Sequence, residues 1–247
     1  MIRFLSVFAI IATLTTSQTS NFEVQEATIA DIHRALASQR ITCPQLVQKY
    51  LERIDAYDKK GPAINAIITV NSKALDEARA MEAEIARAGI TKPLQCIPVA
   101  VKDNFETIGL PTTAGSLSLS GWMSNRDAFQ VEKMREAGAI IIAKTNMAEF
   151  AWSPVETVGS MLPGYTRNPP RLIGDLTTPA GDNSQTLSPG TGFPAITVPM
   201  GFVRGEFPSG MTFFGSAWSE SVLIKLAYSY EQAANHRRPP ASTPPFK

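Results

Sequence analysis

Residues 97–104 read Ile-Pro-Val-Ala-Val-Lys-Asp-Asn, a short β-branched apolar run that ends at Lys102 and two further polar residues. Such a run predicts a strand. Further along, residues 127–137 carry a helical pattern that Gly138 stops, and residues 139–143 are wholly apolar, as expected of a strand covered on both faces. Strand, helix and strand at this spacing predict a βαβ-like unit in a layered α/β fold.

Upstream of this unit, from about residue 22 to residue 88, the pattern is helical. Thr28 with Asp31 predicts one helix start, and Thr42 followed by Pro44 predicts a second. A third helix is expected to stop at Gly89. Apolar residues at helical spacing support these helices: Ile32, Ala35, Leu36, Leu46, Val47, Tyr50, Leu51, Ile54, Leu75, Ala78, Met81 and Ile85.

Downstream of the unit, residues 154–192 are rich in Gly, Pro, Thr, Ser and Asn and show no period. A structureless loop of about forty residues is unusual in a compact domain, so it should be functional, disordered or the sign of a missing segment. Residues 195–202 and 211–214 then predict strands, and residues 219–235 predict an amphipathic helix. The basic, proline-rich residues 236–247 are typical of a solvated end.

Composition narrows the function classes. The chain has 247 residues, of which 44% are hydrophobic and 18% charged, as in a folded globular protein. With 23 Lys and Arg against 22 Asp and Glu, the net charge of +1 provides no general attraction to nucleic acid or acidic membranes. Two cysteines and two histidines do not favour a disulfide framework or a zinc cluster. We expect no metal, no cofactor and no nucleic-acid partner.

The first twenty residues are typical of a secretory signal peptide. Arg3 precedes an apolar run from Phe4 to Leu14, and small polar residues follow. The run is too short for a stable membrane anchor, so we expect a secreted or periplasmic protein. A cytoplasmic protein with a frayed apolar N-terminus stays open, because no clean cleavage motif follows. After export Cys43 and Cys96 could pair, or they could be two small buried hydrophobes.

Lys102 is the main candidate for chemistry. A lysine at the end of an apolar strand can lie in a low-dielectric cleft, where desolvation lowers its pKa enough to make it a base. The alternative is a solvated lysine in a strand-end loop. The sequence contains no G-x-S-x-G elbow, no phosphate-binding loop, no G-x-G-x-x-G and no H-E-x-x-H.

The residues around Lys102 resemble the core of the amidase signature family, in its peptide-amidase-like branch. The resemblance covers almost all of the chain after residue 20, and its matching stretches are residues 97–105, 109–116, 127–150 and 191–199. It implies a layered α/β/α fold with a mixed central sheet, and hydrolysis of C–N amide bonds in small molecules or peptides. Lys102 would be the base that acts through a bridging serine on a second, nucleophilic serine. Backbone N–H groups of a Gly-rich loop would stabilise the oxyanion.

The departure from the family concerns both of those serines. The family carries them in a Gly/Ser-rich segment of the type G-G-S-S-G-G-S, followed by T-D-x-G-G-S, and neither run occurs here. Residues 165–169 resemble the stretch just before that segment, whereas residues 170–175 resemble one near the family's C-terminal end. We therefore expect a seam at residues 168–171, which divides the amidase domain into residues 21–169 and 170–247. A deletion, a splicing event or an error in the predicted gene structure would each produce it.

Three hypotheses follow for function. The first is an amide hydrolase by descent that is inactive in this chain, with unpaired strand edges and apolar faces where its central portion is missing. The second is a non-catalytic binding protein, for example a partner of a full-length amidase. The third is an active enzyme that uses Ser116, Ser118 or Ser160 near Lys102.

Overall fold

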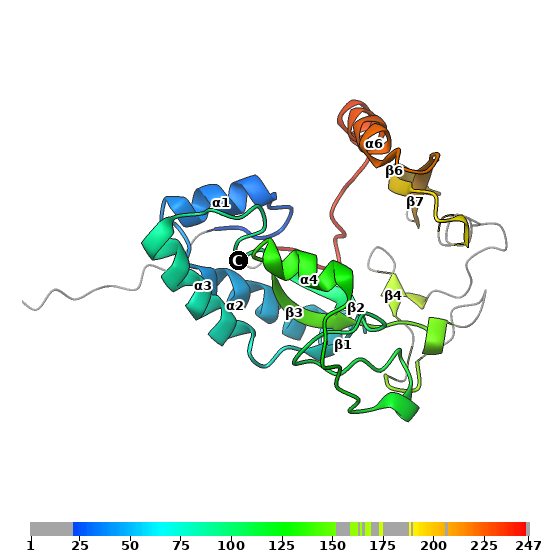
Figure 1. Cartoon of the computed structure of the whole chain (residues 1–247). Helices are drawn as coiled ribbons and strands as arrows, with labels where there is room; N and C mark the ends of the chain where they lie inside the picture. The colour runs from blue at the N-terminus through cyan, green and yellow to red at the C-terminus, as the bar shows by residue number, and fades with distance from the viewer. Residues whose placement is uncertain are drawn as a thin grey trace, which may run out of the picture.

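The computed structural model describes residues 22–151, 159–162, 164, 166–168, 173–174, 188, 190–205 and 207–245 (Figure 1). The expected signal peptide lies outside the described residues, as does most of the stretch 154–192 with its seam. No helix in the described part of the chain is long and apolar enough to cross a membrane.

The helical layer begins where the sequence predicts. Helix α1 (Ile29–Ala37) starts at a capping box in which the Thr28 hydroxyl accepts the Asp31 N–H at 3.1 Å. Helix α2 (Cys43–Ile54) starts at a second box that pairs Thr42 with Gln45, and it continues into the π-helical turn η1 (Asp55–Lys59). Helix α3 (Ala74–Ala88) ends at Gly89, whose φ of 73° suits a glycine. The three predicted helices are confirmed.

A three-stranded mixed sheet lies next to these helices (Figure 1). Strand β2 (Pro98–Lys102) is parallel to the central strand β3 (Ile140–Thr145), and helix α4 (Phe129–Glu136) connects the two. Strand β1 (Ile67–Val70) pairs antiparallel with the other edge of β3. The predicted βαβ unit is confirmed. The prediction of a helical pattern throughout residues 22–88 was wrong at β1, because that strand is too short for its period to stand out.

The core explains why the fold is layered. Successive residues of a strand point to opposite faces. Accordingly Ile140 and Ile142 pack in one cluster with α1, α2 and α3, whereas Ile141 packs on the other face with Val131 of α4. The wholly apolar run of β3 is therefore covered on both faces. The layered α/β fold with a mixed sheet, predicted from the resemblance, is confirmed.

Cys43 and Cys96 form a disulfide, with 5.8 Å between their Cα atoms. Both residues are fully buried in the core between the helices and the sheet. Of the two alternatives that the sequence leaves open, the structure shows the pair. The bond joins the first residue of α2 to the segment just before β2.

The later part of the chain forms a lobe of its own in Figure 1. Strands β6 (Ala195–Val203) and β7 (Phe207–Phe214) make an antiparallel hairpin, against which helix α6 (Glu220–Ala234) packs. A second, short antiparallel pair consists of β4 (Arg167–Asn168) and β5 (Ile173–Gly174). The two predicted strands and the helix are confirmed, although β7 begins earlier than predicted.

Many large apolar side chains of this lobe are exposed. Leu223 and Ala227 of α6 are buried, but other apolar residues of the same helix are about half exposed or more, and Trp218 is 91% exposed. The exposed set is Phe193, Met200, Val203, Phe214, Trp218, Val222, Ile224, Leu226 and Tyr228. Exposed apolar faces are what the sequence analysis expects.

Residues 236–245 are not the solvated end that their composition suggests. Thr243 is only 8% exposed, and the carbonyl of Pro244 accepts hydrogen bonds from Arg53 and Tyr57. The proline-rich stretch therefore packs on the helical layer. Composition alone missed this contact, because its partners lie almost two hundred residues earlier in the chain.

Candidate active site around Lys102

Lys102 is the last residue of β2 and lies opposite Thr145 of β3. Its side chain is exposed, and within the described residues it makes no hydrogen bond or ion pair. The structure thus places it at the carboxyl end of a parallel strand pair, where α/β folds commonly position functional groups. Its surroundings are solvent rather than the desolvated cleft considered from the sequence.

The neighbouring residue, Asp103, is fully buried and organises the loop that follows. One oxygen of its carboxylate, Oδ2, accepts the N–H of Thr113 at 3.1 Å, the N–H of Gly115 at 3.2 Å, and the Thr113 hydroxyl. The Asp103 carbonyl also accepts the N–H of Ala114 at 3.2 Å. The loop after Lys102 is therefore folded back onto the end of β2.

Lys144 of β3 completes this arrangement from below. It is fully buried, and its ammonium lies 3.5 Å from the second Asp103 oxygen, Oδ1. It donates to the carbonyls of Phe105 at 2.8 Å and Pro111 at 3.3 Å, and to the Thr112 hydroxyl at 3.0 Å. Burial lowers the pKa of Lys144, and the Asp103 carboxylate partly opposes that effect. Three acceptors and one counter-charge thus hold a cation where water does not reach.

The serines nearest to this loop gather around Glu149, not around Lys102. Ser116 is 1% exposed, donates to the Glu149 carboxylate and lies 2.8 Å from the Ser118 hydroxyl. Ser160 accepts the N–H of Leu117 at 2.9 Å. Hydrogen bonds from Ser116 and then Ser160 lower the pKa of Glu149. A carboxylate stabilised in this way is a poor base, and a buried hydroxyl bound to it is poorly placed to attack a substrate.

Two glycines let the backbones around these serines meet. Gly115 has a φ of 73°, and a Cβ there would lie 2.8 Å from the carbonyl oxygen of Met147. A Cβ on Gly159 would lie 2.7 Å from the Gly115 carbonyl oxygen. The N–H of Met161 reaches that same oxygen at 3.0 Å. The space beside Ser116 is thus filled by backbone.

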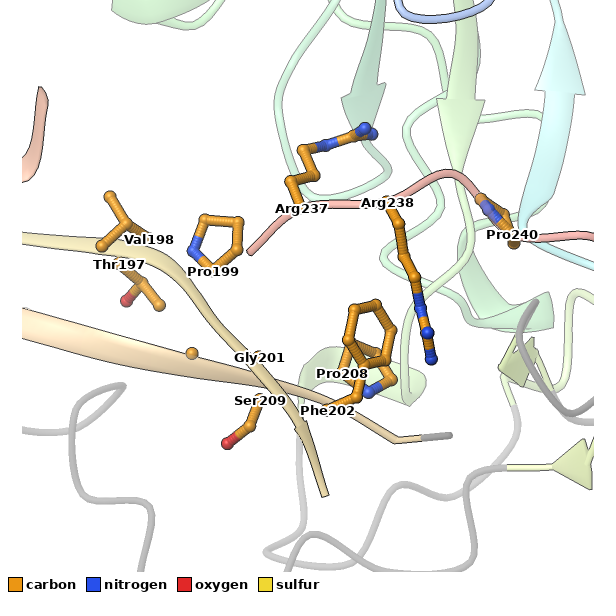
Figure 2. A pocket seen from close by; sticks show the side chains of 11 residues that line it. Thr197, Val198, Pro199, Gly201, Phe202, Pro208, Ser209, Arg237, Arg238 and Pro240 are labelled. Carbon is orange, nitrogen blue, oxygen red and sulfur yellow. The ribbon is translucent and has the colours of Figure 1, made fainter. Parts of the chain in front are cut away.

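The largest pocket among the described residues lies elsewhere, on the β6–β7 hairpin (Figure 2). It has a volume of about 470 Å³ and is lined by Thr197, Val198, Pro199, Gly201, Phe202, Pro208, Ser209, Gly210, Arg237, Arg238 and Pro240. Neither Lys102 nor any of the serines near it belongs to this lining. The pocket and the candidate site are therefore separate features.

The sequence profile of the Amidase family matches residues 45–172, slightly more than half of the chain. The chain belongs to the amidase family. It is 40% identical over 143 residues to a glutamyl-tRNA(Gln) amidotransferase polypeptide, the A subunit, of Acidothermus cellulolyticus, covering 58% of this chain and 27% of that protein. For the corresponding polypeptide of Alkaliphilus metalliredigens, identity is 37% over 209 residues, covering 83% of this chain and 40% of the relative.

A solved structure shows the same fold. The native peptide amidase of Stenotrophomonas maltophilia matches with a TM-score of 0.54 and 35% identity, over 60% of this chain and 31% of that enzyme. The chain thus spans between about a quarter and two fifths of the length of these amidase relatives. Membership of the family, inferred from the residues around Lys102, is confirmed.

Lys102 remains a prediction from the resemblance. The sequence analysis passed over the buried partners Asp103, Lys144 and Glu149, although one signal was available. Lys144 interrupts an otherwise apolar strand, and a charged residue in a strand covered on both faces requires a buried partner.

Proposed function

We propose that this chain is an amide hydrolase by descent that does not itself hydrolyse amides. The observation that carries the proposal is the absence from the 247 residues of the Gly/Ser-rich runs in which the family keeps both catalytic serines. Without them, Lys102 has no bridging serine to deprotonate, and no nucleophile or oxyanion loop follows from it. A lone lysine is only a weak general base.

Two further observations support this proposal. The family match ends at residue 172, next to the seam expected at residues 168–171. The serines that could replace the missing ones, Ser116 and Ser160, donate to Glu149 instead of facing Lys102. In a chain that retained the whole family core, Lys102 would act as the base through its bridging serine, on small-molecule or peptide amides.

The test is serine labelling of the purified chain with a fluorophosphonate, together with ammonia release from a peptide amide. We expect neither labelling nor release, and no change in Lys102→Ala or in the surface control Lys92→Ala. Labelling of one serine that disappears in Lys102→Ala but persists in Lys92→Ala would overturn the proposal. It would favour an enzyme that uses Ser116, Ser118 or Ser160.

The intact mass of the protein from its native source tests the seam itself. A mass near 26.7 kDa, less any signal peptide, supports an internal deletion in the mature protein. A mass near that of a full-length amidase would show that the seam is an error in the predicted gene structure. Lys102 would then have its serines, and the inactivity proposed here would not apply to the native protein.

A non-catalytic binding role is the second candidate, favoured by the exposed apolar side chains of the β6–β7–α6 lobe. Contiguous exposed apolar surface commonly marks an interaction site. Saturable binding of this chain to a full-length amidase, weakened by polar substitution of Ile224 and Leu226, would support that role. A pull-down from the native source without a stoichiometric partner would count against it.

We further propose that the protein is exported. The buried Cys43–Cys96 disulfide supports this location, because such bonds form and persist in oxidising compartments. Thiol labelling of the native protein under denaturing conditions should give no signal until a reductant is added. N-terminal sequencing should begin near residue 21. Free thiols and an intact N-terminus would instead indicate the cytoplasm.

A further inference from the structure

Residues 237–245, named here the strap, are fastened at one end to the β6–β7 hairpin. The Arg238 guanidinium lies over the Phe202 ring, 3.9 Å from its centre, and donates to the carbonyl of Gly205. In Figure 2 the Arg238 side chain points toward Phe202, whereas Arg237 points away from the pocket. The hairpin end of the strap is thus held by stacking and by a charged hydrogen bond.

The other end of the strap rests on the helical layer. From the last turn of α2, Arg53 donates through Nη1 to the Pro244 carbonyl at 3.0 Å and through Nη2 to the Thr243 carbonyl at 3.1 Å. From η1, the Tyr57 hydroxyl donates to the same Pro244 carbonyl at 2.7 Å. The Arg53 guanidinium also lies 5.0 Å from the centre of the Tyr57 ring, so the two side chains support each other.

The chemistry of the two surfaces is complementary. A guanidinium offers only N–H donors, and here the Tyr57 phenol donates as well. The strap offers mainly acceptors, because four of the seven residues from 239 to 245 are prolines and have no backbone N–H. An extended proline-rich backbone is also stiff, so it loses little entropy when it binds. Donors spaced to reach successive carbonyls therefore suit such a segment.

We infer that Arg53 and Tyr57 form a recognition surface for an extended proline-rich segment, and that the strap of the same chain occupies it. The strap then holds the β6–β7–α6 lobe to the helical layer. The ion pair between Arg237 and Glu26, which precedes α1, adds a link between the same two parts. This role is independent of amide hydrolysis, since neither Arg53 nor Tyr57 belongs to the candidate site.

Hydrogen exchange by mass spectrometry on the full chain tests the inference. The readout is exchange of the amide protons of residues 241–243 in fragments that contain the strap. Tyr57→Phe, which keeps the ring and removes the hydroxyl donor, should speed this exchange by about fivefold, the value of one neutral hydrogen bond. Arg53→Lys, which cannot reach both carbonyls in one plane, should speed it at least as much.

Tyr50→Phe is the matched control. Tyr50 lies on the same helix and donates to the carbonyl of Val24 at 3.3 Å, without contact to the strap. Its loss should leave exchange of the strap unchanged. Unaltered exchange in the fragments of α2 and β3 will show that each variant is folded.

Three outcomes would overturn the inference. The first is a strap that exchanges in the wild-type chain as fast as an unstructured peptide. The second is exchange that stays the same in Tyr57→Phe and Arg53→Lys. The third is protection of the strap that rises with protein concentration, which would show that a second copy supplies the occupant and that the surface does not bind in cis.

Discussion

At the scale of single residues, the buried pair of Lys144 and Asp103 organises the end of the sheet. Through these two side chains, β3 and the end of β2 hold the loop that follows Lys102 by way of five hydrogen bonds to Phe105, Pro111 and residues 112–113, and one to Gly115. A buried charge costs much free energy when its partner is removed, more than the intact pair gains. The pair is therefore a sensitive point for the stability of this loop.

Lys144→Met should lower the free energy of unfolding by about 3–5 kcal/mol, because it leaves the Asp103 charge buried and uncompensated. Urea denaturation measures the loss. Adding Asp103→Asn should recover part of it, since the second change removes the unpaired charge. The exposed pair Lys60–Asp55 provides the control: Lys60→Met should cost less than about 1 kcal/mol. A small loss in Lys144→Met would contradict the burial described here.

Glu149 gives a prediction about pH. Its folded-state pKa lies below the ordinary 4.5 because Ser116 and Ser160 hydrogen-bond to the carboxylate. Stability from these bonds is therefore present above pH 4.5 and is lost as the pH falls through the lower folded-state pKa. Wild type should be more stable than Glu149→Gln at about pH 7, and the gap should narrow at about pH 3.

Unfolding curves at the two pH values measure this gap. Glu84→Gln, on the exposed side of α3, should show no comparable change with pH. An equal gap between wild type and Glu149→Gln at both pH values would show that the carboxylate charge does not matter to the serine cluster.

At the scale of secondary-structure elements, the disulfide ties helix to sheet. It closes a loop between positions 53 residues apart, from the start of α2 to the segment before β2. Cross-linking a loop of this length removes entropy from the unfolded chain. The position of β2, and with it that of Lys102, depends partly on this link.

The double variant Cys43→Ala with Cys96→Ala should be less stable than the oxidised wild type by about 2–4 kcal/mol. Thermal or urea unfolding under non-reducing conditions measures the difference. A reductant should lower the stability of the wild type by a similar amount and leave the double variant unchanged. If the reductant affected neither protein, the two thiols would not be paired in solution.

At the scale of the whole molecule, the β6–β7–α6 lobe exposes apolar residues on several sides of one helix. A helix that is apolar all round is normally buried. In α6 only Leu223 and Ala227 are buried, and four larger residues between positions 222 and 228 are exposed. Such a surface favours self-association or capture by a partner.

We expect the purified chain to self-associate as its concentration rises, and Ile224→Glu with Leu226→Glu to reduce that association markedly. Size-exclusion chromatography with light scattering measures it. Ala233→Glu adds a charge at an exposed position of the same helix without removing a large apolar side chain, so it should have little effect. A wild-type chain that stays monomeric at high concentration would contradict this prediction.

Local signals in the sequence were enough to predict most elements. Capping residues at Thr28 and Thr42, and Gly89 at a helix end, mark boundaries through contacts within a few residues, and these boundaries are confirmed. The apolar run of β3 predicts burial on both faces for the same reason. Strand β1 was missed because four residues carry too little period to compete with the helices around them.

The sequence by itself determined the family, the layered α/β class and Lys102 as the candidate base, since each depends on the order of residues along the chain. Only the tertiary structure decided that Cys43 pairs with Cys96, that Lys144 is neutralised by Asp103, and that the strap binds Arg53 and Tyr57. Those contacts join residues far apart in the chain. Their energies depend on burial and hydrogen-bond geometry, which exist only once helices, sheet and loops have packed together.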